Sequence, residues 1–427
     1  MSEHAAELVQ IEKPLYGGAF LAHAAGKAVF VPLALPGEQA RVRVTEAKRG
    51  YAAAEIEEIV VASAERIAPQ CRHFGACGGC AYQHADYSTE LRLKATILRE
   101  TLERGGVRAP EEMGTLAGEP WGYRNRVRLA FDATGRLGYR GRRSHAVVPI
   151  EECPIAAPLL VRAALAFAEV ARENAPVLRP AEIALFCNAE ETALLASVTA
   201  AAQRKSRFDA WSEDWRAHVP ELCGIEWLLE GRSGLQARVA SRWGVPSIVY
   251  RAAEFDYRVD QGAFFQVNRW LIDALAERVT AGRSGALAWD LFAGVGLFAR
   301  RLTASFSRVV AVESAPASTQ ALAANLKHTR GAPVRATTLD FLRREHAGAR
   351  PDFIVVDPPR AGLGAAVTAA LVSIAAPSMV YVSCDPATLA RDLRALGEGG
   401  YAIDSVTLVD LFPRTFHLET VVELRRA

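Results

Sequence analysis

The sequence has 427 residues, of which 50% are hydrophobic and 23% are charged, and its formal net charge is +2. This length accommodates roughly two to four domains of about 100 to 200 residues each. No apolar run approaches the roughly 18 residues that a membrane helix needs, and the N-terminus lacks a basic start followed by an apolar stretch. We therefore expect a cytoplasmic protein without a membrane partner. Because the net charge is small, any affinity for nucleic acid must come from local patches.

The first predicted unit is a small β-barrel. Between about 11 and 61 the chain alternates runs of β-branched residues with glycine and proline turns, as in "GKAVFVPLALPGEQARVRV". Period-2 runs between such turns are typical of strands. A five-stranded nucleic-acid-binding barrel of the OB type fits this length, and a generic β-module without an RNA role is the alternative.

A cysteine-containing segment follows the barrel. Three cysteines with the spacing Cys-x5-Cys-x2-Cys lie in a glycine-rich loop, and a fourth is available in "PIEECPI". Seven cysteines in a reducing compartment favour metal binding or catalysis over a disulfide framework. On spacing alone, four thiolates suit zinc or an iron–sulfur cluster equally well. Helical apolar spacing over 87–104, ended by two glycines, predicts a helix after the loop.

Residues 121–145 hold seven arginines and one acidic residue, with aromatic residues between them. On a strand, the alternation of Arg124, Arg126 and Arg128 places three guanidinium groups on one face. Such a face suits a phosphate backbone, and the neighbouring rings could stack bases. A solvated charged strand is the alternative, but the density of arginine favours RNA binding. An alanine-rich helix is predicted over about 158–173, within a middle region that is otherwise uninformative.

From about residue 255 onward, strands, glycine turns and helices alternate. The predicted strands "ALAWDLF", "RVVAVE", "PDFIVVD" and "SMVYVSC" are continuous apolar runs, as in a buried parallel sheet. This pattern predicts a doubly wound α/β domain.

Two motifs indicate a nucleoside cofactor. "WDLFAGVGLFARRL" places a glycine turn between a strand and a helix, and Glu313 lies 19 residues after Gly294, where its carboxylate could hold ribose hydroxyls. This motif alone does not separate nicotinamide, flavin and S-adenosylmethionine enzymes. The second motif, "IVVDPPRAG", resembles the Asp/Asn-Pro-Pro turn of S-adenosylmethionine-dependent methyltransferases. Arg360 stands where amine methyltransferases usually have an aromatic residue, which disfavours an exocyclic-amine substrate.

Cys384, in "VYVSCDPATLARDL", follows the last of these strands. It therefore lies at the same end of the sheet as Asp357, and the proline after it indicates a helix N-terminus, which lowers the pKa of a thiol. We expect a nucleophile here rather than a core thiol. His417 and Glu419 are two residues apart and share a face of an extended chain. A thiolate, a carboxylate base and a methyl donor suit methylation at carbon 5 of a pyrimidine, which becomes nucleophilic when a thiolate adds to carbon 6.

The motifs "SCDPATLARDL", "DPPRAGL", "FFQVN", "FPRTFHLETV" and "CRHFGACGGC" together resemble the bacterial RNA uracil-5-methyltransferase family, especially its iron–sulfur-containing 23S ribosomal RNA branch. The N-terminal barrel resembles the TRAM domain that many members carry. The resemblance covers essentially the whole chain. It implies an enzyme that transfers a methyl group from S-adenosylmethionine to carbon 5 of a specific uridine, which must be flipped out of folded RNA. Ribosomal RNA is the favoured substrate and transfer RNA the alternative.

The resemblance also implies residue roles. Cys384 would attack carbon 6 of uracil, Glu419 would remove the carbon 5 proton, and His417 would be a supporting group. The implied cofactor-binding residues are Gln266, Phe292, Glu313, Asp340 and Asp357. The implied ligands of a 4Fe-4S cluster with a structural role are Cys71, Cys77, Cys80 and Cys153.

Three positions depart from the family pattern. Leu297 replaces a frequent polar residue, so one contact to the methionine part of the cofactor is expected to be absent. Asp385 replaces a common asparagine beside the nucleophile, where its charge would raise the thiol pKa unless a partner such as Arg360 neutralises it. Phe416 stands where histidine is frequent.

Two other protein classes are alternatives. A non-catalytic RNA-binding protein would not need Cys384, Glu419 and a full cofactor site. A radical S-adenosylmethionine methylthiotransferase would have Cys-x3-Cys-x2-Cys spacing, whereas the first gap here is five residues. We expect a monomer with a TRAM-like barrel over 1–62, an iron–sulfur and central RNA-binding region over 63–250, and a methyltransferase domain over 251–427. The helix over 87–104 is also a candidate to pack on the third region.

Overall fold

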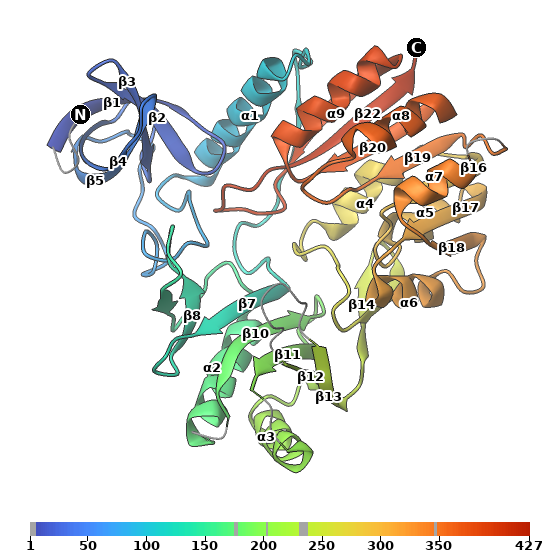
Figure 1. The fold of residues 1–427 in the computed structure, drawn as a ribbon, viewed down its shortest axis with the longest axis horizontal. Helices are drawn as coiled ribbons and strands as arrows, with labels where there is room; N and C mark the ends of the chain where they lie inside the picture. Colours follow the sequence, from blue (N-terminus) through green and yellow to red (C-terminus); the bar gives the residue numbers. More distant parts are fainter. Residues whose placement is uncertain (1–5, 175–177, 202–203, 230–237, 346–347) are drawn as a thin grey trace.

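The computed structural model describes residues 6–174, 178–201, 204–229, 238–345 and 348–427. A barrel, a central sheet with two helices and a larger α/β domain are arranged around the middle of the molecule (Figure 1). No helix in these described ranges combines the length and the apolar character needed to span a bilayer.

The N-terminal barrel is closed, with the strand order β1-β2-β3-β5-β4. It forms because alternate residues of each strand point inward, as Ala40, Val42 and Val44 do in one of them. Its strands are β1 (Ala6–Pro14), β2 (Ala19–Ala24), β3 (Lys27–Pro32), β4 (Gln39–Ala47) and β5 (Tyr51–Val61). The predicted five-stranded barrel is confirmed.

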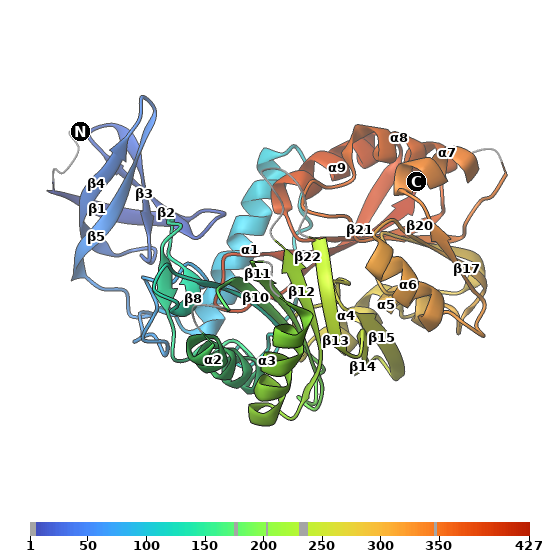
Figure 2. The same cartoon turned by 60° about the horizontal axis from the view of Figure 1, so that its bottom comes forward.

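The central region is a seven-stranded sheet with the order β13-β12-β11-β10-β7-β8-β9, and α2 and α3 cover one face (Figure 2). Phe167, Trp211 and Trp215 pack between these helices and the sheet. The elements are β7 (Arg126–Phe131), β8 (Leu137–Arg140), β9 (Val147–Pro149), α2 (Pro158–Glu173), β10 (Pro180–Cys187), β11 (Leu194–Ala200), α3 (Lys205–His218), β12 (Leu222–Leu229) and β13 (Arg238–Gly244).

A hairpin of β14 (Ser247–Ala252) and β15 (Phe255–Asp260) links the central sheet to the α/β domain. Its buried residues Tyr250, Tyr257 and Val259 belong to the same hydrophobic core as the first helix of that domain, α4 (Ile272–Thr280). The domain boundary expected at 250/251 therefore lies within β14.

The α/β domain contains an eight-stranded sheet with the order β18-β17-β16-β19-β20-β22-β21-β6. Strands β16 to β20 are parallel and β22 is antiparallel to its neighbours, which confirms the predicted doubly wound arrangement. The elements are β6 (Gly114–Leu116), β16 (Gly285–Leu291), α5 (Leu297–Leu302), β17 (Phe306–Glu313), α6 (Pro316–Asn325), β18 (Gly331–Arg335), α7 (Thr338–Glu345), β19 (Phe353–Val356), α8 (Gly364–Ile374), β20 (Ser378–Ser383), α9 (Pro386–Glu398), β21 (Tyr401–Val409) and β22 (Glu419–Arg426).

The helix that follows the cysteine loop, α1 (Tyr87–Arg104), packs on this domain (Figure 1). Asp86 caps it by accepting a hydrogen bond from the Thr89 amide at 2.8 Å. It ends at Gly105, where an added Cβ would lie 2.5 Å from the Cβ of Ala390 in α9. Glycine is therefore required for the close approach of the two helices.

Candidate functional site

The glycine turn of the expected cofactor site lies between β16 and α5. Phe292, Gly294 and Gly296 all have positive φ angles, of 65°, 56° and 94°. A Cβ on Gly296 would lie 2.7 Å from Leu322 Cδ1, so the turn is packed closely against α6. The Gly294 amide donates a hydrogen bond of 2.9 Å to Glu313 Oε2, which holds this carboxylate beside the turn. The structure thus brings Phe292, Gly294 and Glu313 together.

Gln266 and Asp357 line a small cavity with Phe292 and Gly294. Gln266 Nε2 donates a hydrogen bond of 3.3 Å to Asp357 Oδ2. Burial raises the pKa of Asp357 to about 7, although the hydrogen bond from Gln266 opposes the shift. Burial also raises the pKa of Asp290, at the end of β16, to about 8, and one of its buried carboxyl oxygens has no hydrogen-bond partner. Buried acidic groups beside a glycine turn fit a nucleoside cofactor that carries positive charge, such as S-adenosylmethionine.

Asp340, another implied cofactor residue, lies at the start of α7. It is exposed in the first turn of α7, where Thr337 Oγ1 donates a hydrogen bond of 2.7 Å to its carboxylate. Its own amide donates to the same hydroxyl at 3.2 Å, so the two residues cap the helix. Among the described residues that line the cofactor cavity, Asp340 does not occur.

Cys384 and Glu419 face each other across neighbouring strands. The antiparallel pairing of β20 with β22 places Ser383 opposite Thr420. Cys384 is the next residue after Ser383, and Glu419 is the residue before Thr420, so the strand register brings the two side chains to the same place. Glu419 is 5% exposed. Residues separated by 35 positions in the chain are therefore adjacent at the carboxyl end of β20.

The surroundings of the Cys384 thiol disfavour its thiolate form. Burial, together with the nearby Glu419 and Asp357 carboxyl groups, raises its pKa to about 12. Burial and Asp357 also raise the pKa of Glu419 well above its usual range. Burial of the thiol is therefore the main obstacle to thiolate formation. The expected lowering of the thiol pKa by the helix N-terminus is wrong for the ligand-free protein.

Asp385 explains why the helix does not lower the thiol pKa. Its carboxylate caps α9 and accepts hydrogen bonds of 3.0 and 2.9 Å from the amides of Ala387 and Thr388. The acid, rather than the thiol, thus occupies the positive end of the helix. The second carboxylate oxygen accepts a hydrogen bond of 3.2 Å from the Tyr16 hydroxyl of the barrel. The sequence did not indicate Tyr16, because nothing local connects it to a residue 369 positions away.

Arg360 pairs with His417 rather than with Asp385. Its guanidinium lies 3.2 Å from His417 Nδ1. Burial and the positive charge of Arg360 lower the pKa of His417 to about 4, so the imidazole is neutral at physiological pH. Its ring lies 4.2 Å from the ring of Phe416, measured between centroids. His417 thus forms part of the wall of the site next to Glu419.

The segment 410–418 connects these residues to the rest of the molecule, and Figure 1 shows it reaching from the α/β domain to α1. The buried Lys94 of α1 forms an ion pair of 2.7 Å with Asp410 and donates to the Phe412 carbonyl at 3.0 Å. The Arg414 carbonyl accepts hydrogen bonds from the amides of Ala81 and Tyr82, in the cysteine segment. The segment that leads to Glu419 is therefore held by α1 and by the cysteine loop.

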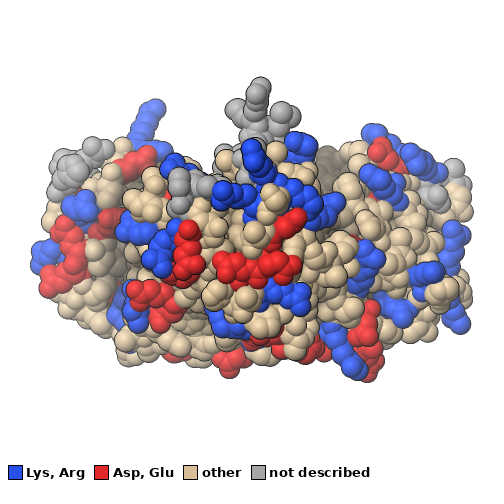
Figure 3. All heavy atoms as spheres, turned by 90° about the horizontal axis from the view of Figure 1, so that it is seen from below, with Lys and Arg blue, Asp and Glu red and all other residues tan. Residues whose placement is uncertain are grey.

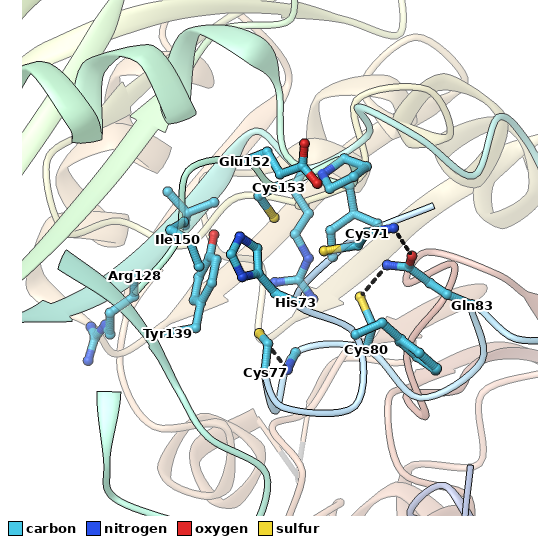
Figure 4. Close-up of a pocket in the computed structure, with 16 residues that line it drawn as sticks. Cys71, His73, Cys77, Cys80, Gln83, Arg128, Tyr139, Ile150, Glu152 and Cys153 are labelled. Carbon is cyan, nitrogen blue, oxygen red and sulfur yellow. Dashed lines mark hydrogen bonds between the residues drawn. The ribbon is translucent and has the colours of Figure 1, made fainter. Parts of the chain in front are cut away.

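The four predicted cluster ligands lie around one cavity of about 210 Å³ (Figure 4). These ligands are Cys71, Cys77, Cys80 and Cys153. Gln83 Nε2 donates a hydrogen bond of 3.3 Å to Cys80 Sγ, and the Gly79 amide donates one of 3.4 Å to Cys77 Sγ. Burial raises the pKa of Cys80 to about 12. Arg124 also lines the cavity and provides a positive charge beside the thiols.

The arrangement of the thiols is relevant to the choice between a single ion and a cluster. In the described part of the chain, no three His, Cys, Asp or Glu side chains are grouped as ligands of one metal ion. Four thiolates around zinc would each lie about 2.3 Å from the ion, which leaves no cavity between them. The cavity of about 210 Å³ is lined by the four cysteines and by further residues such as Arg124 and Tyr139.

The three arginines expected on one face make different contacts. Arg124 precedes β7 and lies 5.8 Å from the centroid of the Phe412 ring. Arg126 stacks on Phe186, with its guanidinium carbon 4.6 Å from the ring centroid. Arg128 is largely exposed and pairs with Glu182 at 3.4 Å. Arg126 and Arg128 line one cavity together, and Arg128 also lines the cysteine cavity with Arg124.

Comparison with known proteins identifies the family. A family model described as tRNA (Uracil-5-)-methyltransferase matches residues 348–427, and a TRAM domain model matches residues 7–56. The chain is 32% identical over 418 residues to the 23S rRNA (uracil(1939)-C(5))-methyltransferase of Halomonas elongata, covering 93% of this chain and 85% of that one. It is 34% identical over 423 residues to the enzyme of the same name from Chromohalobacter salexigens, covering 94% and 85%.

A solved structure has the same fold. The tRNA (uracil-54, C5)-methyltransferase of Pyrococcus abyssi, in complex with S-adenosyl-L-homocysteine, superposes with a TM-score of 0.77 at 24% identity. The match covers 97% of this chain and 99% of that one, so it includes the barrel, the central sheet and the α/β domain. Given this fold and the identity to curated relatives along nearly the whole chain, the protein belongs to the S-adenosylmethionine-dependent RNA uracil-5-methyltransferase family.

Proposed function

We propose that this protein transfers a methyl group from S-adenosylmethionine to carbon 5 of a uridine in 23S ribosomal RNA, through a covalent adduct with Cys384. The observation that carries this proposal is the strand register that sets Cys384 opposite Glu419, beside the crevice formed by the glycine turn and Asp357. Ribosomal RNA is favoured over transfer RNA because curated relatives at 32–34% identity are named as 23S rRNA methyltransferases.

In the proposed reaction, the Cys384 sulfur forms a bond to carbon 6 of the uracil, and the electron pair of the carbon 5–carbon 6 double bond moves into an enolate. S-adenosylmethionine supplies an electrophilic methyl group. Carbon 5 forms a bond to this methyl group, and S-adenosylhomocysteine leaves with the electron pair of the broken sulfur–methyl bond. Glu419 then accepts the proton of carbon 5, the carbon 6–sulfur bond breaks, and the thiolate is restored.

The raised pKa of Glu419 suits this role. A carboxylate with a high pKa accepts a proton more readily than an ordinary one, once it has been ionised. Gln266, Phe292, Glu313 and Asp357 are the proposed cofactor-binding residues. Asp340 remains a weaker candidate because its carboxylate already accepts a hydrogen bond from the Thr337 hydroxyl.

The substrate assignment is tested by mapping 5-methyluridine by mass spectrometry in ribosomal and transfer RNA from a strain that lacks the gene. We expect one 5-methyluridine to disappear from 23S RNA and to return with the wild-type gene but not with C384A. A loss from transfer RNA instead would replace the substrate assignment and keep the chemistry. A loss from neither RNA would refute the activity, and restoration by C384A would refute the cysteine mechanism.

We further propose that Cys71, Cys77, Cys80 and Cys153 hold a 4Fe-4S cluster. The supporting features are the cavity between the four thiols, the N–H donors to two sulfur atoms and the positive charge of Arg124. Hydrogen bonds to sulfur are among the factors that tune such clusters. The Ala81 amide, next to Cys80, donates to the Arg414 carbonyl at 2.7 Å, so the cluster would also anchor the segment that leads to Glu419.

This proposal is tested on protein purified without oxygen. We expect iron and acid-labile sulfide in equal amounts, and a strong decrease of both in C80A. C187A, which changes a buried cysteine outside the cavity, is the matched control and should keep the wild-type iron content. Stoichiometric zinc without sulfide, or an unchanged iron content in C80A, would contradict the assignment.

A further inference from the structure

The face of the central sheet that is turned away from α2 and α3 contains a cavity of about 290 Å³. Val127 and Leu129 of β7 point into the core beneath the helices, whereas Arg126 and Arg128 alternate with them and line the cavity. Seen from below, the molecule mixes Lys and Arg with Asp and Glu, and no single-sign patch dominates that face (Figure 3). A polar cavity of this size is at the lower limit for a small-molecule site.

Arg126 is the main unsatisfied group of the cavity. Its guanidinium stacks on Phe186 and donates one hydrogen bond, of 2.7 Å, to the Ala263 carbonyl. Its Nε is buried and has no hydrogen-bond partner among the residues that the structure describes. Burial and the charge of Arg128 lower its pKa to about 10. A guanidinium has five N–H donors, and leaving donors of a buried cation unpaired is costly, so the site is suited to a ligand with acceptor atoms.

Acidic residues line the same cavity. Glu226 is 7% exposed and accepts a hydrogen bond from Arg242 through only one of its carboxylate oxygens. Asp260 is 6% exposed and pairs with Arg258. A carboxylate has about four acceptor positions, so both acids keep acceptor capacity. These acids disfavour a phosphate group in the cavity. They favour a ligand that offers acceptors to Arg126 and N–H donors to a carboxylate.

Among the nucleobases, guanine meets both requirements with pairs of groups on two separate edges. Its O6 and N7 accept a bidentate pair of hydrogen bonds from arginine, and its ring N–H and amino group form a second pair that can donate to a carboxylate. Base planes also stack on arginine guanidinium groups. Uracil and adenine have no two adjacent acceptors, and cytosine has one donor group only, its amino group, on the same edge as its adjacent acceptors.

We propose that this cavity binds an unpaired guanine of the RNA substrate and is a recognition subsite separate from the position of the target uridine. The proposal rests on the proposed function and adds a sequence requirement to it. One chain segment contributes to both sites, since Gln261 lines the cavity and Gln266, five residues later, lines the cofactor crevice. A guanine bound here would position the RNA relative to the methyl donor.

The test uses the full-length protein saturated with S-adenosylhomocysteine, so that the cofactor crevice is blocked. Binding of guanosine, inosine and uridine 5′-monophosphates is measured by ligand-observed NMR. We expect guanosine monophosphate to bind at least about fivefold more tightly than the other two, because inosine lacks the amino group. R126K and E226Q should each weaken its binding at least about fivefold. R251K and E190Q, which change exposed residues outside the cavity, are the matched controls.

Thermal unfolding measurements identify variants that fail to fold. E226Q keeps the shape of the Glu226 side chain, so it still tests the cavity if R126K does not fold. Equal binding of the three nucleotides, or unchanged binding by a folded E226Q protein, would overturn the proposal. Methylation assays separate the two proposals. If the wild-type protein binds guanosine monophosphate selectively but methylates no RNA, the proposed function fails and the nucleotide site stands. If the wild-type protein methylates RNA and E226Q keeps the wild-type KM for RNA, the guanine subsite is refuted and the proposed function stands.

Discussion

Replacing Glu419 by glutamine separates the proposed chemical role of the carboxyl from its place in the core. The side chain is 5% exposed, and burial with Asp357 raises its pKa well above the usual range. The raised pKa favours the neutral carboxylic acid, and the amide has nearly the same size and also no charge. We expect E419Q to fold, with a free energy of unfolding within about 1 kcal/mol of the wild type at pH 5.

The stability of the two proteins should diverge with pH. The unfolded chain loses the Glu419 proton near its ordinary pKa of about 4.3, whereas the folded protein keeps it to a higher pH. The folded state thus binds more protons, and wild-type stability falls as the pH rises from about 4.3 toward the raised pKa, by at most about 1.4 kcal/mol per pH unit. Glutamine does not titrate, so urea unfolding between pH 5 and 8 should increasingly favour E419Q. A difference that does not change with pH would refute the reasoning.

The catalytic effect of E419Q should be large. Loss of a general base typically costs about 10²- to 10⁴-fold in rate. Because addition of Cys384 and methyl transfer precede proton removal, the variant should accumulate a covalent protein–RNA adduct that contains the transferred methyl group. Denaturing gels with methyl-labelled S-adenosylmethionine detect this adduct. Turnover within threefold of the wild type, or a folded variant that forms no adduct, would contradict the role assigned to Glu419.

Three further predictions concern the crevice. The affinity for cationic S-adenosylmethionine should rise as the pH increases through about 7, because Asp357 ionises there, and D357N should give a flat profile in isothermal titration. Y16F removes the hydrogen bond to Asp385 and should lower kcat by roughly tenfold. The Kd for S-adenosylmethionine should stay unchanged, and an altered Kd would argue against a purely positioning role of Tyr16. Iodoacetamide should alkylate Cys384 faster with S-adenosylmethionine bound than with S-adenosylhomocysteine bound, because only the former carries a positive sulfonium. Peptide mass spectrometry measures the rate at Cys384. Equal rates would count against electrostatic activation of the thiol.

The α/β domain could be predicted from the sequence because its signals are local. Buried parallel strands are continuous apolar runs, and cofactor and substrate groups gather at their carboxyl ends. The glycine turn, Asp357 and Cys384 each follow such a run directly. The five-stranded barrel was predictable for a similar reason, since its residues alternate between the inside and the outside of the barrel.

The electrostatics of the site could not be predicted in the same way. The pKa of Cys384 depends on burial and on Glu419, and the latter arrives through the pairing of β20 with β22. The partner of Asp385 is a tyrosine of the barrel, and the partner of Arg360 is His417, both distant in sequence. A motif shows which groups are present, but their charges depend on contacts that only the folded chain provides.

Burial beside other acidic groups raises the pKa of both the Cys384 thiol and the Glu419 carboxyl. Arg360 opposes the rise in the thiol pKa but does not cancel it. A bound sulfonium would add a positive charge beside these groups, and a nearby positive charge favours the thiolate. If Cys384 is the nucleophile, we therefore expect its reactivity to depend on the bound methyl donor, and the alkylation experiment measures this dependence.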